Sequence, residues 1–385
     1  MDKAKVSGII KKYTMVIVLV LVTLFFTWQT GGKMLLPQNV TNLIAQNAYV
    51  FILATGMLLC ILTGGNIDLS VGSVVCFVGA VGGTFMVNKN MNMALVILIM
   101  ILVGILIGAW QGFWIAFVRI PPFIVTLAGM LVFRGLSNVI LNGRTVAPMP
   151  ENYLALFNNY IPDPFGGSIN IICILAGVLA SLIYIFVVFK GRAGRIKKGY
   201  ETEKLAGVIV KTAIICIVIL AFMFRLAQYK GIPNVLIWVL VVILIYSYIT
   251  SKTTIGRYFY AVGGNEKATQ LSGINTNKVY FIAYLSMGLL AAVAAMVTIA
   301  RLNSANPTAG NNYEMDAIGS CFIGGASAYG GTGTVPGVII GATLMGVINL
   351  GMNIMGVDAN YQKVVKGLVL LAAVIFDVVS KNRSK

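Results

Sequence analysis

The stretch from Val50 to Gly82, VFILATGMLLCILTGGNIDLSVGSVVCFVGAVG, holds two apolar runs that are separated by a short polar break. The first run reaches back to Val40, and the second begins at Ser70. Each run is therefore about the length that a helix needs to cross a bilayer, roughly 20 residues. The break carries Asp68, and a carboxylate between two membrane spans is energetically costly. This stretch predicts membrane-spanning helices with an interruption that has a specific role.

The composition of the whole chain agrees with this prediction. Hydrophobic residues make up 58% of the 385 residues and charged residues only 10%, with a mean hydropathy of +0.91. A soluble domain normally carries about 25% charged residues, so this chain cannot cover itself in water. The sequence predicts an all-α, polytopic integral membrane helix bundle.

Several kinds of chemistry are excluded by composition alone. Histidine is absent, which rules out a His-ligated metal, a haem ligated by His and a Ser-His-Asp triad. The five cysteines stand singly inside apolar runs and form no CxxC motif, so they are interpreted as packing residues. We expect no metal site, no catalytic residue and no cofactor.

Eleven apolar runs are candidate membrane spans: Tyr13–Trp28, Val40–Leu62, Ser70–Val87, Met93–Val118, Phe123–Leu141, Ile169–Phe189, Val208–Met223, Val235–Ile249, Val279–Ala300, Val335–Met355 and Tyr361–Val379. A shorter, glycine-rich stretch, Ala317–Ala328, is either a short span or a broken helix. We expect residues 1–385 to form a single transmembrane domain with about twelve crossings, eleven of them long. Two GxxxG pairs, at Gly104/Gly108 and Gly337/Gly341, favour close helix packing.

The net charge of +17 lies in short loops between the apolar runs, which indicates membrane topology and no nucleic-acid surface. With both termini in the cytoplasm and the short segment crossing, eighteen Lys and Arg residues lie on the inner side and six on the outer side. This distribution follows the positive-inside rule. The basic cluster from Lys190 to Lys204 is interpreted as an anchor facing membrane lipid rather than as a binding site.

Three polar breaks interrupt the apolar pattern. In the first, Gly64–Ser73, Asp68 and Ser70 either cap the following helix or line a pathway, and both interpretations can hold together. In the second, Arg119–Gly129, Thr126 either bonds within its own helix or faces the pathway. The third, Asn303–Ser320, repeats an acidic residue followed by Gly-Ser and then by Gly-Gly, which is a weak internal two-fold repeat. The candidate pathway residues are Asn66, Asp68, Ser70, Phe123, Thr126, Asn303 and Glu314.

The loop from Ser251 to Lys278 has the signals of a short surface helix on the cytoplasmic side. Asn265 can cap this helix, Glu266 suits its positive end and Gly273 suits a left-handed exit. Ala268 and Leu271 then share one exposed face. The helix is either a docking element for a partner or an ordinary connection.

No GxxxxGK[ST] phosphate-binding loop occurs in the chain, so it cannot drive transport with ATP by itself. From the residues alone it is a passive channel, an ion-coupled transporter or the membrane half of a machine whose motor is another polypeptide.

Four motifs, Gly65–Ser73, Pro122–Gly129, Gly263–Ile274 and Glu314–Gly325, follow one another in that order. With them the chain resembles, nearly end to end, a permease of the bacterial sugar ABC importers of the ribose, xylose and galactoside group. It is most similar to multiple-monosaccharide permeases, which carry an inserted basic loop and helix pair like residues 190–250 here. The resemblance implies a cytoplasmic coupling loop, 251–278, with these residues in the helix that seats in the ATPase: Gly264, Asn265, Glu266, Ala268, Leu271, Gly273 and Ile274.

The resemblance also implies partners. They are an ABC ATPase, an extracytoplasmic sugar-binding protein and a second permease copy, in the bacterial cytoplasmic membrane, with the permease itself not an enzyme. The alternatives are an ion-coupled sugar transporter, in which Asp68, Glu314 or Asp316 carries protons, and an ABC permease for another small solute such as branched-chain amino acids.

Overall fold

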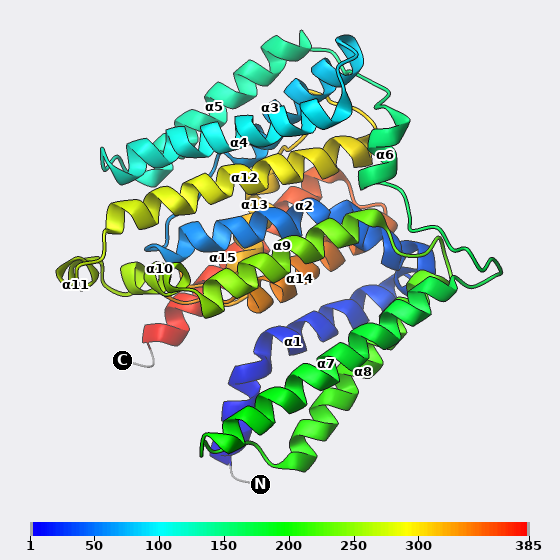
Figure 1. The fold of residues 1–385 in the computed structure, drawn as a ribbon, viewed down its shortest axis with the longest axis vertical. Helices are drawn as coiled ribbons and strands as arrows, with labels where there is room; N and C mark the ends of the chain where they lie inside the picture. Colours follow the sequence, from blue (N-terminus) through cyan, green and yellow to red (C-terminus); the bar gives the residue numbers. More distant parts are fainter. Residues whose placement is uncertain (1–2, 383–385) are drawn as a thin grey trace. The chain divides into compact units, whose positions relative to one another are not determined.

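The computed structural model describes residues 3–382, except for the side chains of residues 3–13, 376 and 380–382 (Figure 1). Its helices are α1 Lys3–Gln29, α2 Pro37–Leu62, α3 Val71–Gly83, α4 Met93–Ala116, α5 Pro122–Leu141, α6 Glu151–Phe157, α7 Ile171–Lys197, α8 Leu205–Ala227, α9 Asn234–Lys252, α10 Thr254–Gly264, α11 Glu266–Leu271, α12 Thr276–Leu302, α13 Tyr313–Ile323, α14 Val335–Ile354 and α15 Ala359–Asn382. A π-helical turn, Thr84–Asn88, extends α3. The described part of the chain contains two isolated β-bridges and no strand, so the all-α prediction is confirmed.

Each of the eleven predicted spans lies in a helix apart from at most two residues at an end, the third of them in α3 and its π-helical turn. Among the described residues, nine helices are long and apolar enough to cross a membrane. The apolar part of α1, Thr14–Gln29, is shorter, and α15 is not among the nine. Seven basic residues of the charge count have side chains outside the described set: Lys3, Lys5, Lys11, Lys12, Lys381, Arg383 and Lys385. Twelve crossings and two cytoplasmic termini therefore stay predictions.

The chain divides into two compact units. The first takes the described residues up to Met34, Leu43–Asn158 and those from Val235 onward, and it holds every motif singled out above. The second takes Leu35–Asn42 and Asn159–Asn234, and its body is the helical hairpin of α7 and α8. The predicted inserted segment, 190–250, overlaps the second unit but begins and ends at other residues.

Small residues let the helices of the first unit approach closely. A Cβ atom on Gly104 of α4 would lie 2.5 Å from the carbonyl oxygen of Gly288 on α12. A Cβ atom on Gly341 of α14 would lie 2.1 Å from the carbonyl oxygen of Ser320 on α13. Both predicted GxxxG pairs therefore mark sites of backbone-to-backbone packing.

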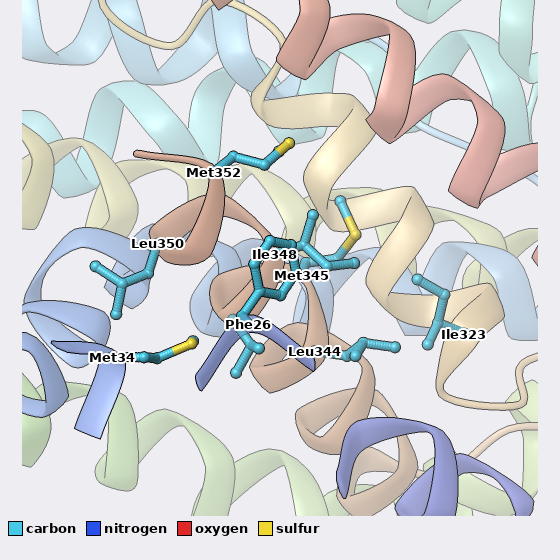
Figure 2. Packing of buried hydrophobic residues seen from close by; sticks show 9 residues of the cluster. Phe26, Met34, Ile323, Leu344, Met345, Ile348, Leu350 and Met352 are labelled. Carbon is cyan, nitrogen blue, oxygen red and sulfur yellow. The ribbon is translucent and has the colours of Figure 1, made fainter. Parts of the chain in front are cut away.

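The buried apolar cluster around α14 fixes the position of α13, which the site requires. Figure 2 shows Phe26 and Met34 on one side of this cluster, together with Leu344, Met345 and Ile348 of α14. Ile323, the last residue of α13, belongs to the same cluster. Burial of large side chains of this kind stabilises a helix contact by about 1.5–3 kcal/mol each in water, and in lipid the same contacts act mainly through dispersion.

Candidate functional site

The first break turns back into the bundle after α2 ends at Leu62. The backbone N–H of Asp68 donates to the sulfur of Met57, 3.4 Å away and more than one turn before the end of α2. Ser70 in turn accepts a hydrogen bond from Gln111, more than one turn before the end of α4. The helix α3 therefore starts inside the bundle rather than at its edge, and with its π-helical turn it is 18 residues long.

Asp68 is buried, with 3% of its surface exposed, and its partners come from the break itself. Its Oδ1 accepts from the backbone N–H of Ser70 at 2.8 Å and from the Ser70 hydroxyl at 2.6 Å. Ser70 is the N-cap residue of α3, yet its side chain makes no capping bond. The predicted capping by Ser70 is wrong because its hydroxyl is committed to Asp68 and Gln111. Gln111 was missed, although an amide inside an apolar span is a signal that the sequence displays.

The third break, Asn303–Ser320, leads into a short helix, α13. Tyr49 of α2 donates its hydroxyl to Oδ2 of Asp316 at 2.6 Å, and Cys321 donates its thiol to the carbonyl of Ala54 at 3.2 Å. Both pairs are 267 residues apart, so α13 runs beside α2 in the same direction. Tyr49 lies near the middle of α2, so α13 begins at half the depth of that helix. Of the two alternatives for Ala317–Ala328, the structure shows the broken helix, which starts earlier, at Tyr313.

The non-helical backbone before α13 is satisfied by protein groups. Asn303 ends α12 in the left-handed conformation, with a φ of 50°, and its side chain accepts from the N–H of Met149 at 2.9 Å. Arg134 of α5 donates to the carbonyls of Pro307 at 3.1 Å and Ala309 at 2.7 Å. Unwound backbone is tolerated at membrane depth only when it has such partners. Arg134 was missed, although a lone arginine inside an apolar span is a clear signal.

The first and third breaks contact each other at their glycines. A Cβ atom on Gly72 would lie 2.2 Å from the carbonyl oxygen of Gly310 and 2.6 Å from Oε2 of Glu314. The positive N-terminal ends of α3 and α13 therefore face one shared region, next to carboxylates. Of the predicted pathway residues, the structure places Ser70 and Glu314 on these two helix starts, with Asp68 bonded to Ser70.

The other predicted pathway residues make local hydrogen bonds or are exposed. Thr126 is fully buried, and its hydroxyl donates to the carbonyl of Pro122, so bonding within its own helix is confirmed. Phe123 is 55% exposed. Asn66 bonds locally to Thr63, and Asn303 serves the backbone turn described above.

Asp316 forms the second buried carboxylate centre. Lys366 of α15 lies 2.9 Å from its Oδ1 and 3.1 Å from its Oδ2, while the ring of Tyr49 stacks on Tyr313 with centroids 3.5 Å apart. The side chain of Asp316 is 2% exposed and that of Lys366 is 17% exposed. Sequence reasoning named Asp316 but missed Lys366 and Tyr49, because the pairing joins residues far apart in the chain.

The predicted surface helix is present as α11, with six residues. Asn265 accepts from the N–H of Ala268 at 2.9 Å, as expected of a cap, and Gly273 has a φ of +81° at the left-handed exit. Ala268 is exposed, and Leu271 is 90% exposed. Ala268 and Leu271 therefore form an exposed apolar face on this loop.

Arg119, which follows α4, ties this loop to the helices. Its guanidinium lies 2.7 Å from Oε1 of Glu266, and it also donates to Thr276 at 3.1 Å and to Asn277. Burial by itself raises the pKa of Glu266, but the hydrogen bond from Arg119 and its charge, with the hydroxyl of Tyr280, outweigh burial. The pKa of Glu266 is therefore held below its ordinary value of 4.5.

Through Gly263, at the end of α10, the same loop also contacts the chain before α3 and the chain after α13. A Cβ atom there would lie 1.8 Å from the carbonyl oxygen of Leu62 and 2.4 Å from the N–H nitrogen of Gly331. Gly331 itself donates to Leu62 at 3.1 Å. Leu62 directly precedes the first break, and Gly331 follows α13. Gly263 therefore packs against the end of α2 and against the segment that follows α13.

A multi-pass helical protein in which the chain before a short helix, α13, meets the start of α3 inside the bundle has the architecture of a membrane permease. Residues 39–374 match the family of branched-chain amino acid transport system permease components, and the chain belongs to this family. It is 36% identical to the xylose transport system permease protein XylH of Escherichia coli K12, over 97% of this chain and 93% of that protein. It is also 36% identical to the ribose import permease protein RbsC of Bacillus subtilis, over 89% of this chain and 85% of that protein. No solved structure matches the chain.

Proposed function

We propose that the chain is the membrane-spanning permease subunit of an ABC importer that carries a monosaccharide across the bacterial cytoplasmic membrane. Both relatives named above are permeases of systems for pentose sugars, by their names. A neutral sugar needs hydrogen-bonding groups and no fixed counter-charge, and the backbone ends of α3 and α13 offer such groups.

The observation that carries the proposal is the contact of Gly263 with both Leu62 and Gly331. An ATPase seated on Ala268 and Leu271 would move the loop as its two domains close. Because this loop touches the chain before α3 and the chain after α13, its movement would shift the two helix starts relative to each other. The permease would then alternate between two packings.

The proposed assembly contains two copies of this permease, an ABC ATPase and an extracytoplasmic sugar-binding protein, with membrane lipid around the helices. The proposed coupling residues are Gly264, Asn265, Glu266, Ala268, Leu271, Gly273 and Ile274. The proposed pathway borders Asp68, Ser70 and Glu314, with Asn66, Phe123, Thr126 and Asn303 as further pathway residues.

Reconstitution tests this function. The purified chain in liposomes should take up no labelled xylose or ribose under a proton or sodium gradient. Uptake should appear when a cognate ABC ATPase and sugar-binding protein are added together with ATP. Uptake by the chain alone under an ion gradient would contradict the proposal and favour an ion-coupled transporter.

A further inference from the structure

The hairpin of α7 and α8 encloses a cavity of about 340 Å³ near its connecting loop. Three cationic side chains line it, namely Arg192 and Arg195 of α7 and Lys211 of α8. Its other wall is apolar and includes Tyr184 and Val187 of α7. The cavity belongs entirely to the second compact unit, so it is separate from the transport site described above.

The three cations have no carboxylate partner. Within the part of the chain that the structure describes, no Asp or Glu oxygen lies within 4.0 Å of Arg192, Arg195 or Lys211. Arg192 donates only to the backbone carbonyl of Glu203. Lys211 lies in the second turn of α8, one of the most apolar candidate spans. An unpaired ammonium at that depth is costly, so this position calls for an anion from outside the chain.

A buried hydroxyl gives a second, independent sign of a ligand. Thr212 lines the same cavity and is only 5% exposed. Its Oγ1 has no hydrogen-bond partner among the described residues, although a threonine in a helix can bond to the carbonyl four residues earlier. A buried, unsatisfied hydroxyl costs about 1–3 kcal/mol, and an oxygen-rich ligand in the cavity would recover that cost.

We propose that this cavity binds the headgroup of an anionic phospholipid. The phosphodiester would accept hydrogen bonds from the two arginines, Lys211 and the Thr212 hydroxyl. The acyl chains would continue along the apolar wall and the exposed outer faces of the hairpin, where Ile183 is 54% exposed and Val210 is 58% exposed.

Glu203 on the rim selects among anions. Its carboxylate repels a second negative charge, which disfavours free phosphate with its charge of nearly two. The same carboxylate accepts hydrogen bonds from hydroxyl groups. A singly charged phosphodiester that carries hydroxyls, as in phosphatidylglycerol, therefore fits better than either inorganic phosphate or zwitterionic phosphatidylcholine.

The test titrates dihexanoyl phosphatidylglycerol into the purified full-length chain and follows the midpoint of thermal unfolding. Dihexanoyl phosphatidylcholine and inorganic phosphate serve as comparison ligands. The apparent affinity for phosphatidylglycerol should fall about five-fold in Lys211→Gln and in Arg195→Gln, since each basic residue near a membrane contributes about 1 kcal/mol. Thr212→Val should weaken binding, whereas Thr212→Ser should keep it because the hydroxyl remains.

Lys198→Gln is the matched control, because Lys198 belongs to the same basic segment but does not line the cavity. It should bind phosphatidylglycerol as the wild type does. Equal weakening in Lys198→Gln, or equal stabilisation by inorganic phosphate or by phosphatidylcholine, would overturn the proposal. Binding of polyglutamate with the same dependence on Lys211 and Thr212, in the absence of phosphatidylglycerol binding, would assign the cavity to an acidic protein segment instead.

Discussion

The first and third breaks pose the same physical problem, but different chemical groups resolve it at each. Each brings non-helical backbone and a carboxylate into the bundle and then starts a helix there. At the first break, Asp68 is held by neutral donors from Ser70, two residues away. At the third, Asp316 is held by the cation of Lys366 and the hydroxyl of Tyr49, both distant in the chain.

Asp68 is therefore stabilised by its neighbour in the sequence, whereas Asp316 is stabilised by residues distant in the chain. A neutral donor can serve an amide as well as a carboxylate, so the charge of Asp68 is dispensable for its bonds. A buried ammonium cannot do without its carboxylate, because the cation left behind keeps its full desolvation cost. The half-helix α13 is therefore bonded to α15 by charge, while the start of α3 is bonded through Asp68 and Ser70 to its own approach segment and to α4 by neutral donors.

The largest effect is expected where the two breaks touch. Gly72→Ala places a Cβ atom 2.2 Å from the carbonyl oxygen of Gly310, a backbone atom that cannot move aside cheaply. We expect destabilisation of about 3 kcal/mol or more and little accumulated protein. Gly135→Ala in α5 is the control, because nothing lies within 4 Å of its added carbon. Normal folding and uptake of Gly72→Ala, measured beside that control, would show that the breaks do not pack together.

The next effect concerns the ion pair between Lys366 and Asp316. Lys366→Met and Asp316→Asn should each lower the free energy of unfolding by about 3 kcal/mol. Lys366→Met leaves the carboxylate of Asp316 without its cation, and Asp316→Asn leaves the ammonium of Lys366 without its carboxylate. The double variant should lose clearly less than the sum of the two, and this non-additivity measures the coupling in thermal or denaturant unfolding. Strict additivity would contradict a direct pair.

Asp68 should behave differently. Asp68→Asn keeps an oxygen for both donors of Ser70, so it should retain most uptake and cost less than about 1 kcal/mol. Asp68→Leu orphans both donors and should abolish uptake, with a loss of about 2–3 kcal/mol. Uptake and membrane levels of the two variants check this. An inactive Asp68→Asn at normal membrane levels would instead indicate a proton carrier.

The sequence predicted the helices, the breaks and the capped loop because each depends on local chemistry. Apolar run length defines a span, Asn265 caps its own neighbours, and Gly273 adopts the left-handed turn that it favours. Sequence could not reveal Lys366 or Tyr49 as partners of Asp316, since 50 and 267 residues separate them. It also misassigned the hydroxyl of Ser70, because the competing partner, Gln111, comes from another helix.

The smallest effect concerns Arg119 and Glu266, a partly exposed pair. Glu266→Gln should cost less than about 1 kcal/mol. Because the pKa of Glu266 is lowered in the folded state, the stabilising contribution is fully present above its ordinary pKa of 4.5 and is lost as pH falls through the lowered pKa. Unfolding midpoints of wild type and variant should differ slightly at neutral pH and converge in acid. A difference that grows in acid would contradict this pairing.

The central claim, that residues 263–274 connect an ATPase to the chain before α3 and the chain after α13, is tested most directly by Ala268→Arg. The long cation falls on an exposed face that touches neither lipid nor sugar in this account, so membrane levels and unfolding should stay normal. The account predicts that the ATPase no longer copurifies and that uptake falls to background, whereas Ser251→Arg, also exposed but outside the loop's docking face, retains both. Near wild-type uptake by Ala268→Arg would contradict the coupling assignment and, with it, the ATP-driven mechanism.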